Sequence, residues 1–307
     1  MELSVLLNKM LIFVVIMLIG YCLARRKVFG PEFTRTASSL VLNVFMVGTI
    51  ISSIISTGAE RDLSNLSEII LLTFVMTAVG YLTAWTVTRF THVDGGNDAP
   101  YEILMGVGNS MFIALPISEA LYGSYAVFIV SLSCIPFNIL LYSYGVWRLK
   151  GGKNGKLRIK DMLSIPLLST LVGLLIVLLH IPVPNAFKGL LSSLSGATLP
   201  MSMMVIGASL GTVSLLDAFK KPSLAVLSAV RLIVIPALTW IICQFFTNDS
   251  ILLMTCMIIA AAPSAVIVSV LAIQYGHDGV FSSEAVQHST ICSIVTIPVL
   301  IQIFSHL

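Results

Sequence analysis

Long apolar stretches separated by short polar segments make up nearly the whole chain. Hydrophobic residues occupy 57% of its 307 positions and charged residues only 10%, which is more apolar surface than one soluble domain can bury. A membrane-spanning helix needs about 20 apolar residues. Ten stretches meet that requirement, namely residues 3–24, 34–56, 66–90, 101–122, 124–147, 162–181, 189–211, 222–246, 250–274 and 280–305. The sequence therefore predicts an all-α integral membrane protein with ten transmembrane helices.

The second half of the chain repeats the first. A shift of 153 residues places the segment Tyr122–Phe128 on Tyr275–Phe281, with Tyr-Gly at the start and Val-Phe at the end of both copies. We predict two repeats of five helices each, residues 1–153 and 154–307. Such repeats are typical of transporters whose binding site lies near the bilayer midplane, where the two halves meet.

The basic residues predict the orientation of the chain in the cell membrane. Of the 17 Lys and Arg residues, 13 lie in segments that follow an odd-numbered stretch. By the positive-inside rule these segments are cytoplasmic, which places both termini outside. Because five is an odd number, the second repeat enters the membrane upside down relative to the first. We therefore expect a multi-pass protein built from two inverted repeats.

Two stretches are interrupted in mid-span. The fourth contains Gly108-Asn109 and Pro116, and the ninth contains Ala262-Pro263-Ser264. Proline removes an N–H group and clashes with the carbonyl four residues earlier, whereas Gly and Asn tolerate non-helical dihedrals. We expect both helices to break near the midplane, where freed backbone groups must be shielded from lipid. A proline kink between packed helices is the alternative at each position.

Broken helices create a predicted substrate site. The N-termini of the second half-helices present free N–H groups with partial positive charge, which attract an anion. Asn109 adds an amide, and Ser110 and Ser264 add hydroxyl groups. The predicted substrate-binding residues at the two breaks are Asn109, Ser110, Pro116, Ala262, Pro263 and Ser264.

These motifs resemble the auxin efflux carrier family, in its short bacterial branch. The resemblance rests on the segment from Asn109 to Pro116, on Ala262-Pro263 and the following Leu271-Ala272, and on Tyr275-Gly276. It implies that the broken fourth and ninth helices cross each other. It also implies a mobile core of the third to fifth and eighth to tenth helices, which moves against a scaffold of the first, second, sixth and seventh. It also implies an elevator mechanism and small organic anions as substrates, such as auxin in plants and malate-like carboxylates in bacteria.

The resemblance adds a residue of the second stretch to the substrate site, with one departure from the family pattern. Many members carry a proline four residues after an Asn in this helix. Here Asn43 is followed by Val47, whereas Pro200 is present at the equivalent place in the seventh stretch. Asn43 is therefore a predicted substrate-binding residue, although Val47 stands where many members carry the proline.

Ionisable residues inside the stretches are few, and such residues usually mark a pathway. Glu119 is predicted either to carry a proton or pair with a cation, or to reach external water. Arg231 is predicted to compensate Glu119, to attract an anionic substrate or to reach lipid headgroups, and a structural partner role is favoured. Glu284, Gln287 and His288 share one helix face, which we interpret as a solvated helix entry in preference to an ion site.

The predicted function is a secondary transporter of small organic anions, either malate-like carboxylates or auxin-like acids. No adjacent pair of intramembrane acids occurs, which disfavours exchange of sodium for protons, while proton or sodium coupling to a solute stays open. A sodium-coupled symporter of the bile-acid type and a non-transporting membrane ligand sensor are the alternatives.

Other partners and chemistries have little support in the sequence. No phosphate-binding, zinc or nucleophile motif appears, so no enzyme activity, cofactor, metal site or nucleic-acid partner is expected. The GxxxG pattern from Gly207 to Gly211 fits either of two interpretations. It marks a homodimer interface through the second and seventh helices, or packing within one chain.

Overall fold

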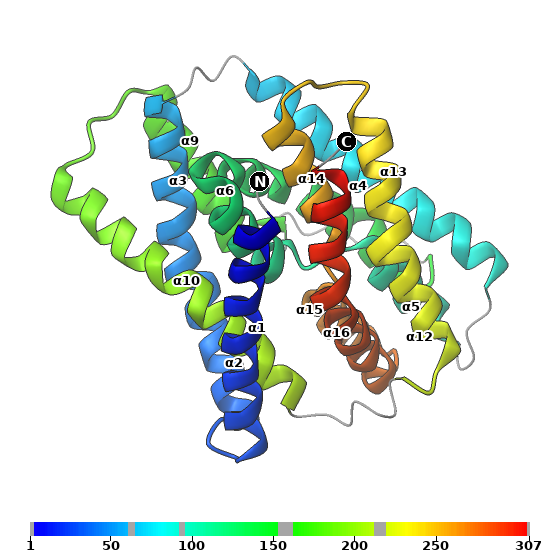
Figure 1. The fold of residues 1–307 in the computed structure, drawn as a ribbon. Coiled ribbons are helices and arrows are strands. Elements are labelled where there is room, and N and C mark those ends of the chain that lie inside the picture. The colour runs from blue at the N-terminus through cyan, green and yellow to red at the C-terminus, as the bar shows by residue number, and fades with distance from the viewer. Residues whose placement is uncertain (1–2, 61–64, 92–95, 153–161, 212–218, 306–307) are drawn as a thin grey trace. The chain divides into compact units, whose positions relative to one another are not determined.

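A computed structural model describes residues 3–60, 65–91, 96–152, 162–211 and 219–305. In these ranges every named secondary-structure element is a helix (Figure 1). The described residues also form one isolated β-bridge. Seven helical segments are long and apolar enough to cross a membrane: Asn8–Arg25, Glu32–Gly58, Leu66–Phe90, Ser110–Leu149, Asn185–Gly211, Pro222–Cys243 and Gly279–Phe304. The prediction of an all-α protein with membrane-spanning helices is confirmed.

The chain divides into two compact units. Unit 1 comprises Met1–Ile69, Met111–Cys134 and Ser164–Val213. Its helices that lie wholly inside these ranges are α1 (Leu3–Arg25), α2 (Pro31–Leu40), η1 (Val41–Phe45), α3 (Met46–Glu60), α9 (Ile165–Leu178) and α10 (Asn185–Gly211). Unit 1 thus holds the first, second and seventh stretches and all but two residues of the sixth, which were predicted to form the scaffold. It also holds residues 66–69 and 111–134.

Unit 2 comprises Ile70–Ser110, Ile135–Leu163 and Ser214–Leu307. Its helices are α5 (Asp98–Gly106), η5 (Leu141–Gly145), α7 (Val146–Leu149), α12 (Pro222–Ala229), η6 (Val230–Val234), α13 (Ile235–Cys243), α14 (Ser250–Ala261), α15 (Val266–Gln274) and α16 (Gly279–Phe304). Three further helices contribute residues to both units: α4 (Leu66–Phe90), η4 (Ser110–Ala114) and α6 (Leu115–Leu140).

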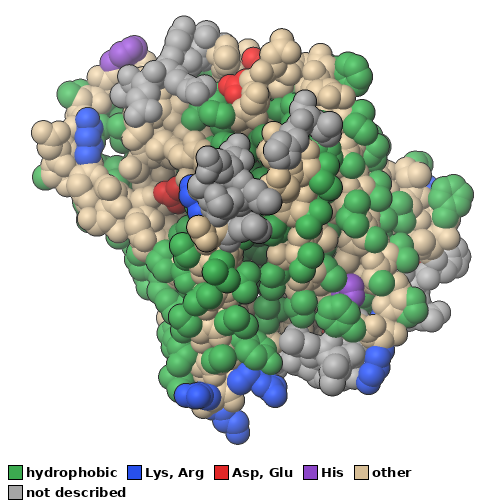
Figure 2. All heavy atoms as spheres, viewed as in Figure 1, with side chains coloured by type: hydrophobic (Ala, Val, Ile, Leu, Met, Phe, Trp, Pro, Cys, Tyr) green, Lys and Arg blue, Asp and Glu red, His purple; other side chains and the backbone are tan. Residues whose placement is uncertain are grey.

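Within unit 1, α1 and α10 pack closely through glycine. A Cβ atom on Gly207 would lie only 1.8 Å from the Met17 carbonyl oxygen, and one on Gly211 would lie 2.7 Å from Ala24 Cβ. The GxxxG motif therefore packs within the chain. The opposite face of α1 exposes large apolar side chains such as Leu11, which is 60% exposed, as expected for a surface in contact with lipid. Figure 2 shows hydrophobic side chains over α1 and α2, with Lys and Arg gathered beyond their lower end.

The repeat of 153 residues is visible in unusual backbone conformations. Apart from glycines, only Lys27 (φ 61°) and His180 (φ 52°) have positive φ among the described residues, and they are 153 positions apart. Gly123 (φ 71°) and Gly276 (φ 83°) form a second such pair at the same separation. Gly123 also interrupts α6, which separates the predicted fourth and fifth stretches. The shift therefore relates turns as well as residue types.

π-Helical turns occur next to prolines in two helices. η4 ends two residues before Pro116, and η6 ends two residues before Pro236. Proline leaves the carbonyl four residues earlier without its N–H donor. The wider π turn accommodates this gap in the helical hydrogen bonds. η1, which contains Asn43, ends two residues before Val47. The wide turn around Asn43 thus forms without the proline of the family pattern.

The predicted sixth stretch, residues 162–181, forms a shorter helix than expected. α9 has 14 residues, about 21 Å at the helical rise, compared with roughly 30 Å for the bilayer core. The chain leaves the helix near His180, which is in the left-handed region, and Pro182 and Pro184 follow. Prolines at this spacing cannot continue the helical hydrogen bonds.

Candidate functional site

The predicted fourth stretch breaks where expected. α5 ends at Gly106, Val107 is extended (φ −112°, ψ 117°), and a new helical segment begins at Ser110. Pro116 was expected to take part in the break, but it lies beyond it, buried in α6 within the unit 1 part of the chain. Its local effect is the π turn before it.

The break in the predicted ninth stretch is formed by proline. α14 ends at Ala261, and Ala262 is extended (φ −62°, ψ 139°). The ring of Pro263 disfavours the helical region for the residue before it, which explains this conformation. The chain becomes helical again at Val266, where α15 begins.

The two breaks cross in unit 2 as a short antiparallel β-bridge. Gly108 faces Ser264. The Asn109 N–H donates to the Pro263 carbonyl at 2.7 Å, and the Ala265 N–H donates to the Val107 carbonyl at 3.0 Å. The bridge satisfies backbone groups that lipid would leave unpaired. The predicted crossing of the two broken helices is therefore present.

At the crossing one helix N-terminus has no side-chain cap, and polar side chains lie at both breaks. The N-cap of α15 is Ala265, which lacks a side-chain oxygen to accept from the first-turn N–H groups, and the next residue, Val266, is 45% exposed. These N–H groups carry the partial positive charge of the helix dipole. Asn109 and Ser110 lie at the start of the other second half-helix, both nearly buried.

Ser264 carries an unpaired hydroxyl group at the bridge. The side chain is fully buried, and its oxygen has no hydrogen-bond partner among the described residues. The backbone N–H of Ser264 donates to the Ser289 hydroxyl on α16 at 3.1 Å. A buried hydroxyl without a partner costs about 1–3 kcal/mol, so this group is a candidate to bind a ligand.

Arg231 reaches the crossing from η6. The side chain is only 3% exposed. Its guanidinium donates to three backbone carbonyls, those of Ala262 (2.8 Å), Gly106 (3.3 Å) and Ile259 (3.5 Å). These carbonyls lie at the C-terminal ends of α5 and α14, where the dipole places partial negative charge. The favoured structural partner role thus agrees with its contacts.

Two predicted site residues lie in unit 1 and have local partners. The Glu119 carboxylate accepts a hydrogen bond from the Ser195 hydroxyl at 2.8 Å, and Lys9 donates to the neighbouring Ala120 carbonyl. Asn43 is exposed and donates to the Ser39 hydroxyl at 2.9 Å. Their predicted roles in coupling and substrate binding stay predictions.

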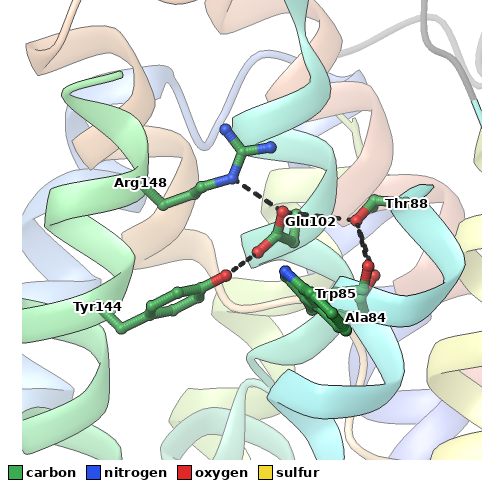
Figure 3. Close-up of polar contacts among 6 residues, drawn as sticks. All are labelled: Ala84, Trp85, Thr88, Glu102, Tyr144 and Arg148. Carbon is green, nitrogen blue, oxygen red and sulfur yellow. Dashed lines mark hydrogen bonds and ion pairs between the residues drawn. The ribbon is translucent and has the colours of Figure 1, made fainter. Parts of the chain in front are cut away.

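The sequence analysis missed a buried carboxylate in unit 2. Glu102 on α5 is 1% exposed and pairs with Arg148 Nε at 2.9 Å. Figure 3 shows the Tyr144 and Thr88 hydroxyl groups, which also donate to it, directed at the same carboxylate. An acidic residue inside the fourth apolar stretch was the signal that could have found it. This cluster ties α5, which leads into the crossing, to α4 and α7.

The polar face of α16 is buried, so its interpretation as a solvated helix entry is wrong. Glu284, Gln287 and His288 are all buried. Lys221 pairs with Glu284 at 2.5 Å, and the Ser228 hydroxyl lies 2.7 Å from His288 Nδ1. Partners next to or within α12 cover this face, which helical periodicity within one stretch could not show.

Comparison with known proteins identifies the family. A sequence model of the membrane transport protein family matches residues 5–158 and residues 153–301. An uncharacterized transporter of Methanothermobacter thermautotrophicus is 26% identical over 289 residues, which are 92% of this chain and 93% of that protein. The resemblance to auxin efflux carriers is thereby confirmed. The chain belongs to the membrane transport protein family of the auxin efflux carrier type, and it is a multi-pass membrane transporter.

Proposed function

We propose that this transporter is a secondary carrier of small organic anions, with a malate-like carboxylate as the substrate to test first. The observation that carries the proposal is the crossing in unit 2. Anionic groups of substrates bind at half-helix N-termini in discontinuous membrane helices, and α15 begins at such a terminus without a side-chain cap. Asn109, Ser110 and Ser264 supply hydrogen-bond donors beside the breaks.

The charge of the crossing supports an anion over a cation as substrate. No carboxylate in the described part of the chain forms an ion pair with Arg231, so the buried guanidinium leaves a positive charge there. In surroundings of low dielectric constant this charge acts more strongly than it would in water. A negatively charged solute is therefore favoured at this place.

Ten membrane crossings in two inverted five-helix repeats form part of the proposal, with both termini outside the cell. The matched turns 153 residues apart support the two repeats. The number ten counts each of the two broken helices as one membrane crossing. The elevator mechanism is supported by the division into two units, of which unit 2 carries the β-bridge and Arg231. A homodimer stays a prediction and would need contacts other than Gly207 and Gly211, which pack against α1.

The test is a counterflow assay with the full-length protein in liposomes. Vesicles loaded with unlabelled malate should accumulate labelled malate from the medium, since a carrier with alternating access exchanges solute without an energy source. Related mono- and dicarboxylates added in excess would rank the substrate class by competition. Binding of malate without counterflow would favour the ligand sensor, and neither binding nor counterflow with any organic anion would refute the proposal.

Asn109→Ala should lower malate counterflow about tenfold or more, because a hydrogen bond to a charged group contributes about 1.5–3 kcal/mol. The matched control is Asn185→Ala at the exposed start of α10, which should leave counterflow unchanged. Protein amount and thermal stability are measured for both variants. Counterflow by Asn109→Ala equal to that of the native protein would remove Asn109 from the site.

A further inference from the structure

Arg231 occupies a cluster of carbonyl oxygens that has the chemistry of a cation site. Its three acceptors belong to Gly106, Ile259 and Ala262, in or next to the last turns of α5 and α14. In transporters with broken helices, carbonyls from such unwound backbone and half-helix C-termini coordinate a coupling sodium ion or proton. Here the three oxygens accept hydrogen bonds from the Arg231 side chain instead.

The backbone around the guanidinium leaves little room for another group. A Cβ atom on Gly108 would lie 1.8 Å from Arg231 Nη2, and one on Gly80 would lie 2.8 Å from the Gly106 carbonyl oxygen. The glycines thus allow the guanidinium, α4 and the break to approach one another. The guanidinium itself therefore fills the space beside Gly108.

Electrostatics gives an independent argument against a second cation. Arg231 is buried, and among the described residues its bonds go to neutral carbonyls and to no carboxylate. A sodium ion at the same carbonyls would meet an unneutralised positive charge within a few ångströms. At so short a separation two positive charges repel each other strongly, even when the surroundings screen them in part.

We propose that Arg231 is a tethered cation that takes the place of a coupling sodium ion at the crossing. The native protein then binds no sodium there, and its transport is independent of sodium. The inference deepens the proposed function by excluding sodium coupling. The transport measurement depends on malate being a substrate, whereas the thermal measurement does not. It also separates this protein from the sodium-coupled symporter considered as an alternative.

The first measurement is the unfolding temperature of the purified protein in NaCl, KCl and choline chloride at equal ionic strength. The native protein should show no difference specific to sodium. Arg231→Ala empties the carbonyl cluster and should be destabilised in choline chloride, but it should gain about 3 °C or more specifically from saturating sodium. Arg231→Lys, which keeps a positive charge, should show no such gain.

Sodium-specific stabilisation of the native protein would overturn the inference, and so would its absence in a folded Arg231→Ala variant. If Arg231→Ala does not fold, Arg231→Gln replaces it, with the same expected gain. In the transport measurement, native counterflow of malate should be equal in sodium and choline media, and a sodium requirement would also overturn the inference. Failure of counterflow in both media would count against the proposed substrate, while the thermal measurement still decides the role of Arg231.

Discussion

Arg231 and Gly108 depend on each other through a close contact. The glycine leaves the space in which the guanidinium lies, and the guanidinium satisfies carbonyls that the breaks in α5 and α14 set free. A buried charge is costly unless hydrogen bonds compensate it. The arrangement is therefore stable only when both residues are present.

A double-mutant cycle measures this dependence. Gly108→Ala alone should lower the unfolding temperature, since the new Cβ atom would lie 1.8 Å from Arg231 Nη2. In the Arg231→Ala background the same change should cost less, with a coupling energy of about 1 kcal/mol or more, as found for residues in contact. If the two substitutions changed the free energy of unfolding additively, the close contact between residue 108 and Arg231 would be contradicted. Gly189→Ala, where no atom lies within 4 Å of the added carbon, is the control for a Gly-to-Ala change.

Residue types could indicate the site, whereas partners distant in the chain could not be read from the sequence. The burial of Arg231 followed from its depth in an apolar stretch, while its favoured structural role stays a prediction. Its acceptors are backbone carbonyls up to 125 positions away. Because every residue has a backbone carbonyl, the sequence does not indicate which ones accept a hydrogen bond. The same limit hid the contacts of Glu102 with Tyr144 and Arg148.

At the scale of elements, glycine determines how closely α1 and α10 approach. Without a hydrophobic driving force between membrane helices, close packing supplies much of the association energy. The Gly207–Gly211 edge of α10 meets the backbone of α1 near Met17 and Tyr21. The packing of this pair is therefore sensitive to a single methyl group.

Two glycines of α10 provide a matched comparison. Gly207→Ala should destabilise the protein by about 1–3 kcal/mol, a typical cost of overpacking, since the added carbon would lie 1.8 Å from the Met17 oxygen. Gly196→Ala, with nothing within 4 Å, should be neutral or stabilising by up to about 1 kcal/mol because alanine has the higher helix propensity. Equal unfolding temperatures for the two variants would contradict the described packing of α1 on α10.

Element boundaries were predictable where a residue type forces a backbone conformation. Pro263 ends α14 because it acts on the residue before it. The Tyr-Gly turn interrupts α6 in the first repeat and follows the end of α15 in the second. Pro116 was misleading, since its effect is a π turn and the break depends on the segment around Gly108. Helix length in α9 also differed, because apolar residues continue after the helix has ended.

At the scale of the whole molecule, inversion of the repeats can be tested with equivalent positions. Val28 and Ile181 are 153 residues apart, each follows a residue of positive φ, and both are exposed. In a background without native cysteines, Val28→Cys should react with a membrane-impermeant maleimide only from the cytoplasmic side. Ile181→Cys should react only from outside. Labelling of both from the same side would exclude inverted repeats.

The order of translation gives the shared carbonyl cluster a consequence for biogenesis. The ribosome completes Gly106 125 residues before it adds Arg231, a delay of roughly 6 to 25 s at about 5–20 residues per second. During that interval the exposed end of α5 lacks its permanent donor, although unsatisfied backbone is costly in hydrocarbon. We therefore expect the end of α5 to stay in contact with water or the insertion machinery until Arg231 has been synthesised.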